Sequence, residues 1–309
     1  MTTPRLRFSI QMPMAPDHKA WTDKVRRAED EGFYSVSVPD HLGRSLPQLA
    51  PMVALGHAAA VTSTVRLAIT VLDNDFRHPV MLAKEAATLD LLSSGRLDLG
   101  LGAGWLVEDY TSTGIATWDP PGVRVDRLFE SIELLRRLFA GGEVSFEGRF
   151  YKVDGFESYP LPVQQPIPLM LGGGGKRMLT KAAREAQIVS ILTRHHGDAD
   201  ARRSAFEEQL GWIEEAGGRA RDDLFVGVRV LFGDVGDPGE SRLDVARRLP
   251  HAMGLAPEDA LDSPFGLIGD LAAIKDHLLA VHERYGISYF TISEDLAWKV
   301  APVVAELAA

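Results

Sequence analysis

The stretch SSGRLDLGLGAGW, residues 93–105, joins a predicted strand to a series of glycines. Its middle part, RLDLGLG at 96–102, alternates in the way that predicts a strand, and its glycines continue past the strand end. Seven more runs of strand length surround it, and helical patterns follow most of them. They are LRFSIQM (6–12), FYSVSVP (33–39), VRLAITV (65–71), IPLMLGG (167–173), QIVSI (187–191), FVGVRVLF (225–232) and SYFTIS (288–293).

Alternating strands and helices in a chain of 309 residues predict an α/β fold, and eight such units suit a closed (β/α)8 TIM barrel with insertions. A doubly wound open sheet is the rival arrangement. No low-complexity tract or flexible linker divides the chain, so we expect a single domain over residues 1–309. Two stretches do not fit the repeat. These are a hairpin insertion at 140–166, turning at Glu147–Gly148, and a loop or lid insertion at 251–266.

Helix starts and apolar faces are readable between the strands. Asp17 is expected to cap the first helix, the second is expected from Leu49 to Val61, and Pro79 is expected to open the third. The residues expected on the buried faces of the first and fourth helices are Trp21, Val25, Ala28, Leu128, Ile132, Leu135 and Phe139.

Composition restricts the possible functions. A formal net charge of −10 argues against nucleic acid as a main partner. The chain contains no cysteine, which excludes disulfides, thiolate metal sites and cysteine nucleophiles. The start MTTPRLRFSIQMP lacks the apolar core of a secretory signal, and no run approaches the ~20 apolar residues of a membrane span. We therefore expect a cytoplasmic, globular protein.

Two glycine clusters suggest nucleotide binding, and neither has the required spacing. In GLGAGW the third glycine of a dinucleotide fingerprint would fall at Trp105, and the run follows the fourth strand instead of the first. In LGGGGKRM, 171–178, a P-loop would need glycine at Met170 and serine or threonine at Arg177. This second cluster still places backbone amides and two cations at a helix start, which suits a phosphate or a plain strand–helix turn. The predicted phosphate contacts are Gly173, Gly174, Gly175, Lys176 and Arg177.

Residues 65–105, VRLAITVLDNDFRHPVMLAKEAATLDLLSSGRLDLGLGAGW, resemble the core signature of the luciferase-like flavin and deazaflavin oxidoreductases. The marks are RHPV.LAKEAATLD and S.GR..LGLGAGW. Further likeness lies in DH after the second strand, in the SFEGRFY hairpin and in FGLIGD before the last helix–strand unit. The resemblance covers roughly residues 6–293 and is strongest to the branch that uses coenzyme F420.

This resemblance implies a barrel whose cofactor, coenzyme F420 or alternatively FMN, lies at the C-terminal mouth. It also implies a non-prolyl cis peptide bond behind the tricyclic ring, which would be Thr70–Val71 here. Asp73 matches a position at which relatives contact the cofactor through a side chain. Gly102 and Gly104 would let the strand end approach the ring, although glycines there can also simply relieve crowding.

Asp40 and His41 directly follow the second strand and are similar to the family's DH pair. The resemblance assigns hydrogen bonds with the cofactor to Asp40 and a proton relay to His41. Hydride chemistry needs such a relay, because one proton must be handled by a group within hydrogen-bond reach. A histidine that caps a local turn is the alternative interpretation.

Trp105 stands where the sugar-phosphate dehydrogenases of this family carry glutamate. Tryptophan offers an apolar wall, so we expect a less charged substrate such as an enone, an imine or an aromatic compound. Glu108 and Asp109 are candidates to replace the acid, although acidic loop residues are usually solvated. Tyr110 and Trp118 are expected to wall the substrate pocket, unless the loop packs on its own side chains.

The remaining polar candidates are expected to be structural. His78 precedes Pro79 and is predicted to cap or pack, while His195 and His196 lack a metal-binding frame and are predicted to be loop residues. The run DND at 73–75 lacks the other EF-hand positions, so no metal site is predicted.

The leading hypothesis is an F420-dependent oxidoreductase that transfers a hydride between the deazaflavin and a small organic substrate. An FMN-dependent monooxygenase that works with a separate flavin reductase is the first alternative. A cofactor-binding barrel without turnover is the second. The resemblance also implies a homodimer. Substrate identity and the direction of transfer depend on loops, which the sequence does not determine.

Overall fold

The computed structural model describes residues 6–193, 197–217, 222–249 and 253–308. The predicted loop residues His195 and His196 lie outside this described part. None of the described helices is both long enough and apolar enough to cross a membrane.

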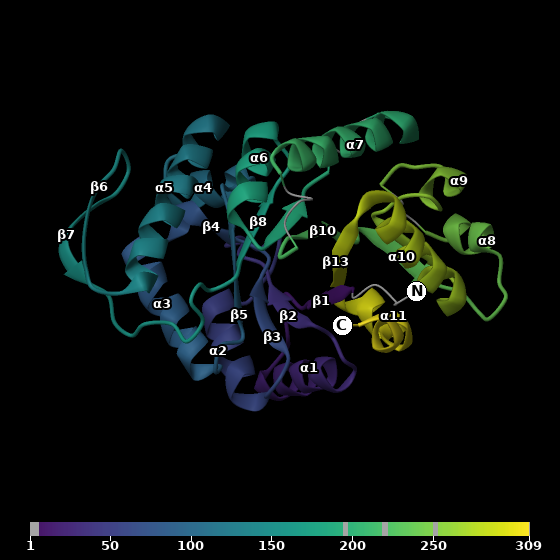
Figure 1. Cartoon of the computed structure of the whole chain (residues 1–309). Coiled ribbons are helices and arrows are strands. Elements are labelled where there is room, and N and C mark those ends of the chain that lie inside the picture. Colours follow the sequence, from purple (N-terminus) through teal and green to yellow (C-terminus); the bar gives the residue numbers. More distant parts are fainter. Residues whose placement is uncertain (1–5, 194–196, 218–221, 250–252, 309) are drawn as a thin grey trace. The chain divides into compact units, whose positions relative to one another are not determined.

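Eight strands form the closed ring that the sequence predicts, and most of them are labelled in Figure 1. Their order is β3-β2-β1-β13-β10-β9-β8-β5, and β5 pairs back to β3. The (β/α)8 barrel is therefore confirmed and the open sheet is wrong. The strands are β1 (Arg7–Gln11), β2 (Ser35–Val38), β3 (Arg66–Ile69), β5 (Leu97–Gly102), β8 (Leu169–Gly173), β9 (Ile188–Ile191), β10 (Phe225–Arg229) and β13 (Ile287–Ser293).

Helices follow most strands, and their buried faces match the predicted ones. The Asp17 carboxylate accepts the Ala20 amide proton at 2.8 Å and so caps α1. The predicted inner residues of α1 and α5 are all buried. The longer helices are α1 (His18–Asp30), α2 (Pro51–Val61), α3 (Pro79–Leu92), α5 (Pro121–Ala140), α6 (Lys176–Glu185), α7 (Ala199–Glu215), α10 (Leu271–Tyr285) and α11 (Glu294–Leu307).

Proline marks the start of several described helices, α2 and α3 among them. Helix α3 begins at Pro79 as predicted, and His78 Nδ1 accepts the Val80 amide proton at 3.2 Å, so its capping role is confirmed. Helix α2 begins at Pro51 instead of Leu49. Proline is favoured at the first helical position because its fixed φ suits the helix and its missing N–H would have no partner there.

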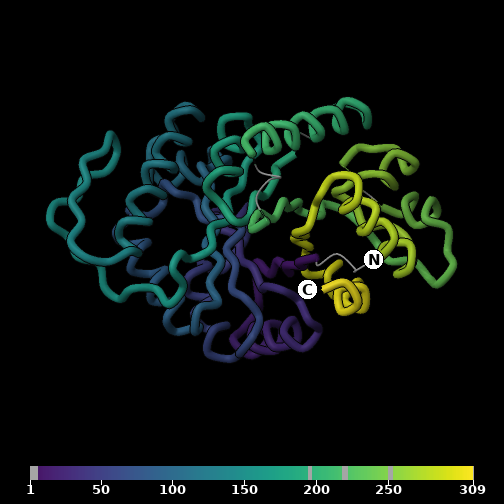
Figure 2. Tube along the Cα trace, in the orientation of Figure 1, coloured from purple at the N-terminus to yellow at the C-terminus, as the bar shows by residue number. Residues whose placement is uncertain are grey.

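The chain forms two compact units, which Figure 2 lets the reader follow along the Cα trace. Unit 1 comprises Met1–Met12, Arg27–Val36 and Gly173–Ala309, and unit 2 comprises Pro13–Arg26 and Ser37–Gly172. Within unit 2, helix α3 packs between α2 and α5 and against β5. The single-domain organisation of residues 1–309 stays a prediction.

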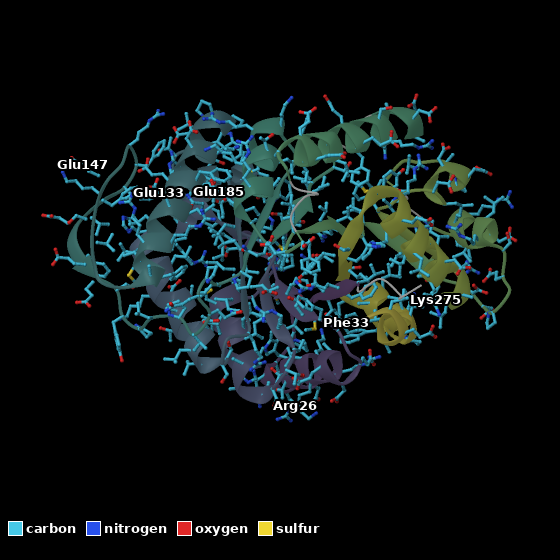
Figure 3. All side chains as sticks on the ribbon, in the orientation of Figure 1. Arg26, Phe33, Glu133, Glu147, Glu185 and Lys275 are labelled. Carbon is cyan, nitrogen blue, oxygen red and sulfur yellow. The ribbon has the colours of Figure 1, made fainter. Side chains whose placement is uncertain are left out.

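The predicted hairpin insertion is confirmed. Strands β6 (Glu143–Glu147) and β7 (Lys152–Glu157) pair antiparallel, and Lys152 Nζ lies 2.9 Å from Glu147 Oε1 beside the turn. Glu147 lies on this hairpin in Figure 3, and Glu133 lies on α5 of the same unit. Both carboxylates are exposed and form ion pairs, Glu133 with Arg137 and Glu147 with Lys152.

The second half of the chain differs from the prediction at two places. The run at 225–232 is not one strand, because β10 ends at Arg229 and a new strand, β11 (Phe232–Val235), begins at its last residue. Strand β11 pairs with β12 (Gly266–Gly269) in a separate two-stranded sheet. The helices between them are α8 (Arg242–Arg247) and α9 (Pro257–Ala260). The described part of the predicted loop, residues 253–266, contains α9 and leads into β12, whose residues pack against α10, while β11 packs against α11.

The glycines of β5 are required by packing against the end of β3. A Cβ atom on Gly100 would lie 1.7 Å from the Ile69 carbonyl oxygen, and one on Gly102 would lie 2.7 Å from Val71 Cγ2. The Thr70–Val71 peptide bond beside these contacts is cis, as the resemblance implies. Relief of crowding therefore explains both glycines. Cofactor contacts at Thr70, Val71 and Gly102 stay predictions.

Replacing Gly100 by alanine is expected to destabilise the protein severely. The new methyl group would overlap a backbone oxygen, which no rotamer change can move. We expect Gly100→Ala to lose more than about 3 kcal/mol of unfolding free energy in urea, or to yield no soluble protein.

Gly56→Ala is the matched control for this experiment. Gly56 lies within α2, and no atom lies within 4 Å of a Cβ built there. This variant should be neutral or more stable by roughly 0.5–1 kcal/mol. Equal stability of the Gly100→Ala and Gly56→Ala proteins would contradict the packing role of Gly100.

Candidate active site

His41 and Asp109 form a hydrogen-bonded pair within unit 2. The imidazole Nδ1 lies 2.8 Å from Asp109 Oδ2, and the two side chains are 15% and 3% exposed. The other carboxylate oxygen accepts the amide protons of Leu42 at 3.1 Å and Gly43 at 3.3 Å. A carboxylate held in this way orients the ring, so that Nδ1 carries the proton toward Asp109. The Nε2 atom is then the one that can exchange a proton with a ligand.

Asp109 is the acid that the sequence interpretation undervalued. A short helix, α4 (Val107–Thr113), replaces the expected irregular loop after β5 and turns Asp109 into the protein. Its neighbour Glu108 faces outward instead and accepts a hydrogen bond from Ser45 Oγ at 3.2 Å. Consecutive helix residues point in different directions, since a turn takes 3.6 residues. The substrate-pocket role of Glu108 stays a prediction.

Tyr110 anchors α4 on the segment that follows β3. Its side chain is 1% exposed, and its hydroxyl lies 2.8 Å from each carboxylate oxygen of Asp73. Burial raises the pKa of Tyr110 above its usual range and the Asp73 charge adds to this, so the hydroxyl stays a donor. The prediction that Tyr110 walls a substrate pocket is wrong, because its ring and hydroxyl are both used inside the protein.

Gly104 makes room for this anchor. Its φ is +75°, a conformation that favours glycine. A Cβ atom there would lie 2.1 Å from the Tyr110 hydroxyl oxygen and 2.5 Å from Asp73 Oδ2. Gly104 is therefore explained by contacts within the protein, and its predicted cofactor contact is untested.

Three neighbouring carboxylates differ in their partners. Asp40 accepts from Arg77 Nη1 at 2.6 Å, and Asp75 accepts from Arg127 Nη1 at 2.8 Å. Within the described residues no cation pairs with Asp73. Burial therefore raises the pKa of Asp73 to about 6, and the charges of Asp75 and Asp40 add to the shift. Asp73 is a carboxyl group that changes protonation in mildly acidic solution.

The Asp40 side chain is fixed by hydrogen bonds within the protein. Its carboxylate accepts hydrogen bonds from both terminal nitrogens of Arg77, at 2.6 and 3.2 Å, and from the backbone amide of Asp73 at 3.2 Å. These contacts fix the backbone that follows the cis peptide bond. Hydrogen bonds between Asp40 and a cofactor stay a prediction, and Arg77 is a site residue that the sequence reasoning did not single out.

An apolar surface lies beside His41. Trp105 is 60% exposed, and its ring meets the His41 ring edge-on at a centroid distance of 5.3 Å. Leu42, Val107 and Ile115 are also exposed although they are large and apolar. Exposed apolar side chains next to a buried polar pair are typical of a ligand site.

Trp118 behaves differently from Trp105. Its ring lies over the Arg124 guanidinium at 3.5 Å and meets the Tyr110 ring at 4.8 Å. The alternative interpretation, a loop that packs on its own side chains, therefore applies to Trp118. The apolar wall beside His41 belongs to Trp105.

Comparison with known families shows which family the chain belongs to. A model of the luciferase-like monooxygenase family matches residues 7–233. The chain belongs to this family. A relative from Nakamurella multipartita, named an F420-dependent glucose-6-phosphate dehydrogenase, is 34% identical over 269 residues, which cover 84% of this chain and 76% of the relative.

Two further comparisons differ in how much of each chain they cover. An uncharacterized Mycobacterium tuberculosis protein is 37% identical over 171 residues, which cover 49% of this chain and 59% of that protein. The chain thus spans less than two thirds of that relative's length. The structure of a coenzyme F420-dependent tetrahydromethanopterin reductase from Methanopyrus kandleri superposes with a TM-score of 0.77 at 20% identity, covering 99% of both chains. At this identity the likeness concerns the fold, which is the barrel.

The second glycine cluster of this luciferase-like chain lies in unit 1, at the start of α6. Gly175 precedes the helix, and no side chain caps it. Cβ atoms on Gly173 and Gly174 would lie 2.5 Å from the Met178 side chain and 2.3 Å from the Leu192 carbonyl oxygen, so both glycines have a packing role. Phosphate binding stays a prediction for Gly173, Gly174, Gly175, Lys176 and Arg177.

Asp73→Asn is expected to change how stability depends on pH. Because the folded state raises the pKa of Asp73 from 3.8 to about 6, the folded protein holds this proton more tightly, and that stabilisation is lost as the pH rises from 4 to 6. Asparagine does not titrate. From pH 4 to pH 7 the unfolding free energy of the variant should therefore gain about 2 kcal/mol relative to the wild type.

Urea unfolding at pH 4, 5, 6 and 7 measures this difference. Glu133→Gln, an exposed carboxylate of α5, serves as the control and should show no such trend. A constant difference between Asp73→Asn and wild type at all four pH values would contradict the raised pKa.

Proposed function

We propose that this protein is an F420-dependent oxidoreductase that transfers a hydride between the deazaflavin and a small organic substrate. The observation that carries the proposal is the His41–Asp109 pair beside the exposed Trp105 ring. The family supports a redox activity. The names of the Nakamurella relative and of the Methanopyrus structure support coenzyme F420 as the cofactor.

The residues around His41 fit a flat tricyclic ring. Trp105, Leu42 and Val107 present apolar surface that the protein leaves exposed, and a ring system would cover it. His41 supplies a hydrogen-bonding edge beside this surface. When bound, the reduced deazaflavin supplies two electrons together as a hydride.

His41 would handle the proton that accompanies the hydride. Reduction of a carbonyl group needs a hydride at carbon and a proton at oxygen, and oxidation of the alcohol needs the reverse. Because Nδ1 is bonded to Asp109, Nε2 would give or take this proton. Asp109 would orient the ring and stabilise its protonated form. His41 is then the catalytic residue and Asp109 a positioning residue, while Trp105 keeps water from one side of the imidazole.

Binding titrations test the cofactor. We expect the purified protein to bind F420 with micromolar affinity and FMN much more weakly, measured by the fluorescence of each ligand. Tight FMN binding, with oxygen consumption when reduced FMN is supplied, would favour the monooxygenase alternative. Binding of neither cofactor would contradict the proposal.

His41→Ala tests the proton relay. It should reduce kcat by about 100-fold or more, because general acid–base catalysis typically contributes 10²–10⁴-fold. The affinity for F420 should stay within about threefold, since His41 supplies only one edge contact of an otherwise apolar site. The alternative of a barrel without turnover predicts no kcat in the wild type either. Full turnover by His41→Ala would refute the relay.

Asp109→Asn tests the positioning role of Asp109, and loss of a carboxylate elsewhere in unit 2 is the control. We expect kcat to fall by roughly 10-fold or more with little change in KM, because the amide cannot stabilise a protonated imidazole as a carboxylate does. Glu133→Gln removes a carboxylate from α5 of the same unit and should leave kcat unchanged.

The homodimer and the cytoplasmic location stay predictions. Sedimentation analysis checks the homodimer, which should have a mass of about twice 33.8 kDa.

A further inference from the structure

Three adjacent strands of unit 1, β1, β13 and β10, have one apolar and one polar face (Figure 1). Successive residues of a strand alternate between faces, and residues in register on neighbouring strands share a face. Phe8 and Phe290 are in register, and their rings stack at a centroid distance of 5.7 Å, so they mark the apolar face. The polar face carries, in register, Arg7 beside Tyr289, Ser9 beside Thr291, and Arg229 on the other side of Thr291.

The polar face of these strands is the inner, concave one. The Tyr289 hydroxyl of β13 lies 3.0 Å from the Ser35 hydroxyl of β2, although β1 runs between the two strands. Side chains of strands that are not neighbours meet in this way on the inner side of a curved sheet, because they converge there. Arg229 shares this face with Tyr289 and therefore points toward the inside of the barrel.

Arg229 is accessible, in contrast to its neighbours on the inner face. It is the last residue of β10, so it lies at the carboxyl end of a strand, where TIM-barrel ligands bind. Thr291 and Ser9, which are in register with it, are only 4% and 0% exposed, whereas Arg229 is an exposed residue. The long arginine side chain therefore extends beyond the packed layer to a place that a ligand can reach.

The charge of Arg229 is not balanced by the part of the chain that the structure describes. Removal of water by the surrounding protein lowers the pKa of Arg229, and no described carboxylate counters this shift. Arg7 lies at the opposite, amino end of the inner face, with its guanidinium 3.5 Å from the centroid of the Phe225 ring. Glu294, the first residue after β13, accepts a hydrogen bond from Trp298 Nε1 at 3.4 Å. An anion would supply the partner that Arg229 lacks.

We propose that Arg229 binds the carboxylate of a small organic anion at the carboxyl end of the strands of unit 1. A guanidinium matches a carboxylate in shape, since two of its N–H groups can donate to the two oxygens in parallel. A single cation at this end of the described inner face matches a single negative charge, which favours a monocarboxylate over a phosphate dianion. This binding does not depend on the proposed function or on the cofactor.

Benzoate and its neutral analogue benzamide test the site. Calorimetric titration and saturation-transfer NMR of the full chain without cofactor should give saturable binding of benzoate. Benzamide has nearly the same shape and should bind about tenfold more weakly or worse, because it lacks the charge. Arg229→Met keeps an extended side chain and removes the cation, so it should weaken benzoate binding about tenfold or more. Arg247→Met, which removes an exposed arginine of α8 in the same unit, is the control and should bind benzoate within about twofold of wild type.

Thermal unfolding of both variants, followed by circular dichroism, verifies that they are folded. The comparison of benzoate with benzamide uses only the wild type, so it tests the need for a charge even if a variant does not fold. Absence of saturable benzoate binding to the wild type would overturn the proposal. So would equal benzoate affinities of wild type and folded Arg229→Met, equal affinities of the wild type for benzoate and benzamide, or tighter binding of inorganic phosphate than of benzoate.

Discussion

The close approach of β5 to the end of β3 is the constraint on which the candidate site depends. Gly100 has no room for a side chain, because the Ile69 carbonyl oxygen occupies that position. This contact fixes the backbone that leads through Val71 to Asp73. The Tyr110 hydroxyl binds Asp73 and anchors α4. Helix α4 in turn carries Asp109, whose carboxylate contacts the His41 imidazole.

The electrostatics of the same segment reinforce this arrangement. Two carboxylates close to Asp73 are neutralised by arginines, Asp40 by Arg77 and Asp75 by Arg127. Asp73 has hydrogen-bond donors but no such cation within the described part of the chain, which is why burial can raise its pKa. The site thus combines rigid ion pairs with one carboxyl group that titrates near pH 6. Rigid supports of this kind favour a fixed catalytic geometry.

Local patterns predicted much of the fold. All eight barrel strands were readable as apolar runs, and the hairpin at Glu147–Gly148 and the helix start at Pro79 were readable from turn and cap residues. The run at 225–232 misled, because Val230 and Leu231 continue the apolar pattern from the end of β10 at Arg229 to the start of β11 at Phe232. A change of sheet between two short apolar segments leaves no mark in hydrophobic periodicity.

The site was predictable only in part. The DH pair follows a strand, so His41 could be singled out, and its chemistry could be argued from residue type. The burial of Asp109 could not, because it depends on Tyr110 reaching Asp73, which lies 37 residues earlier in the chain. The same long-range bond made Tyr110 an anchor instead of a pocket wall. Contacts of this length have no signature in local sequence.

A crystal structure of the protein with bound F420 is the most direct test of the central claim, that hydride chemistry takes place beside His41. We expect the deazaflavin ring to contact Trp105, with His41 Nε2 turned toward the cofactor and its Nδ1 still bonded to Asp109. A ring bound without contact to either Trp105 or His41 would contradict the assignment of this site.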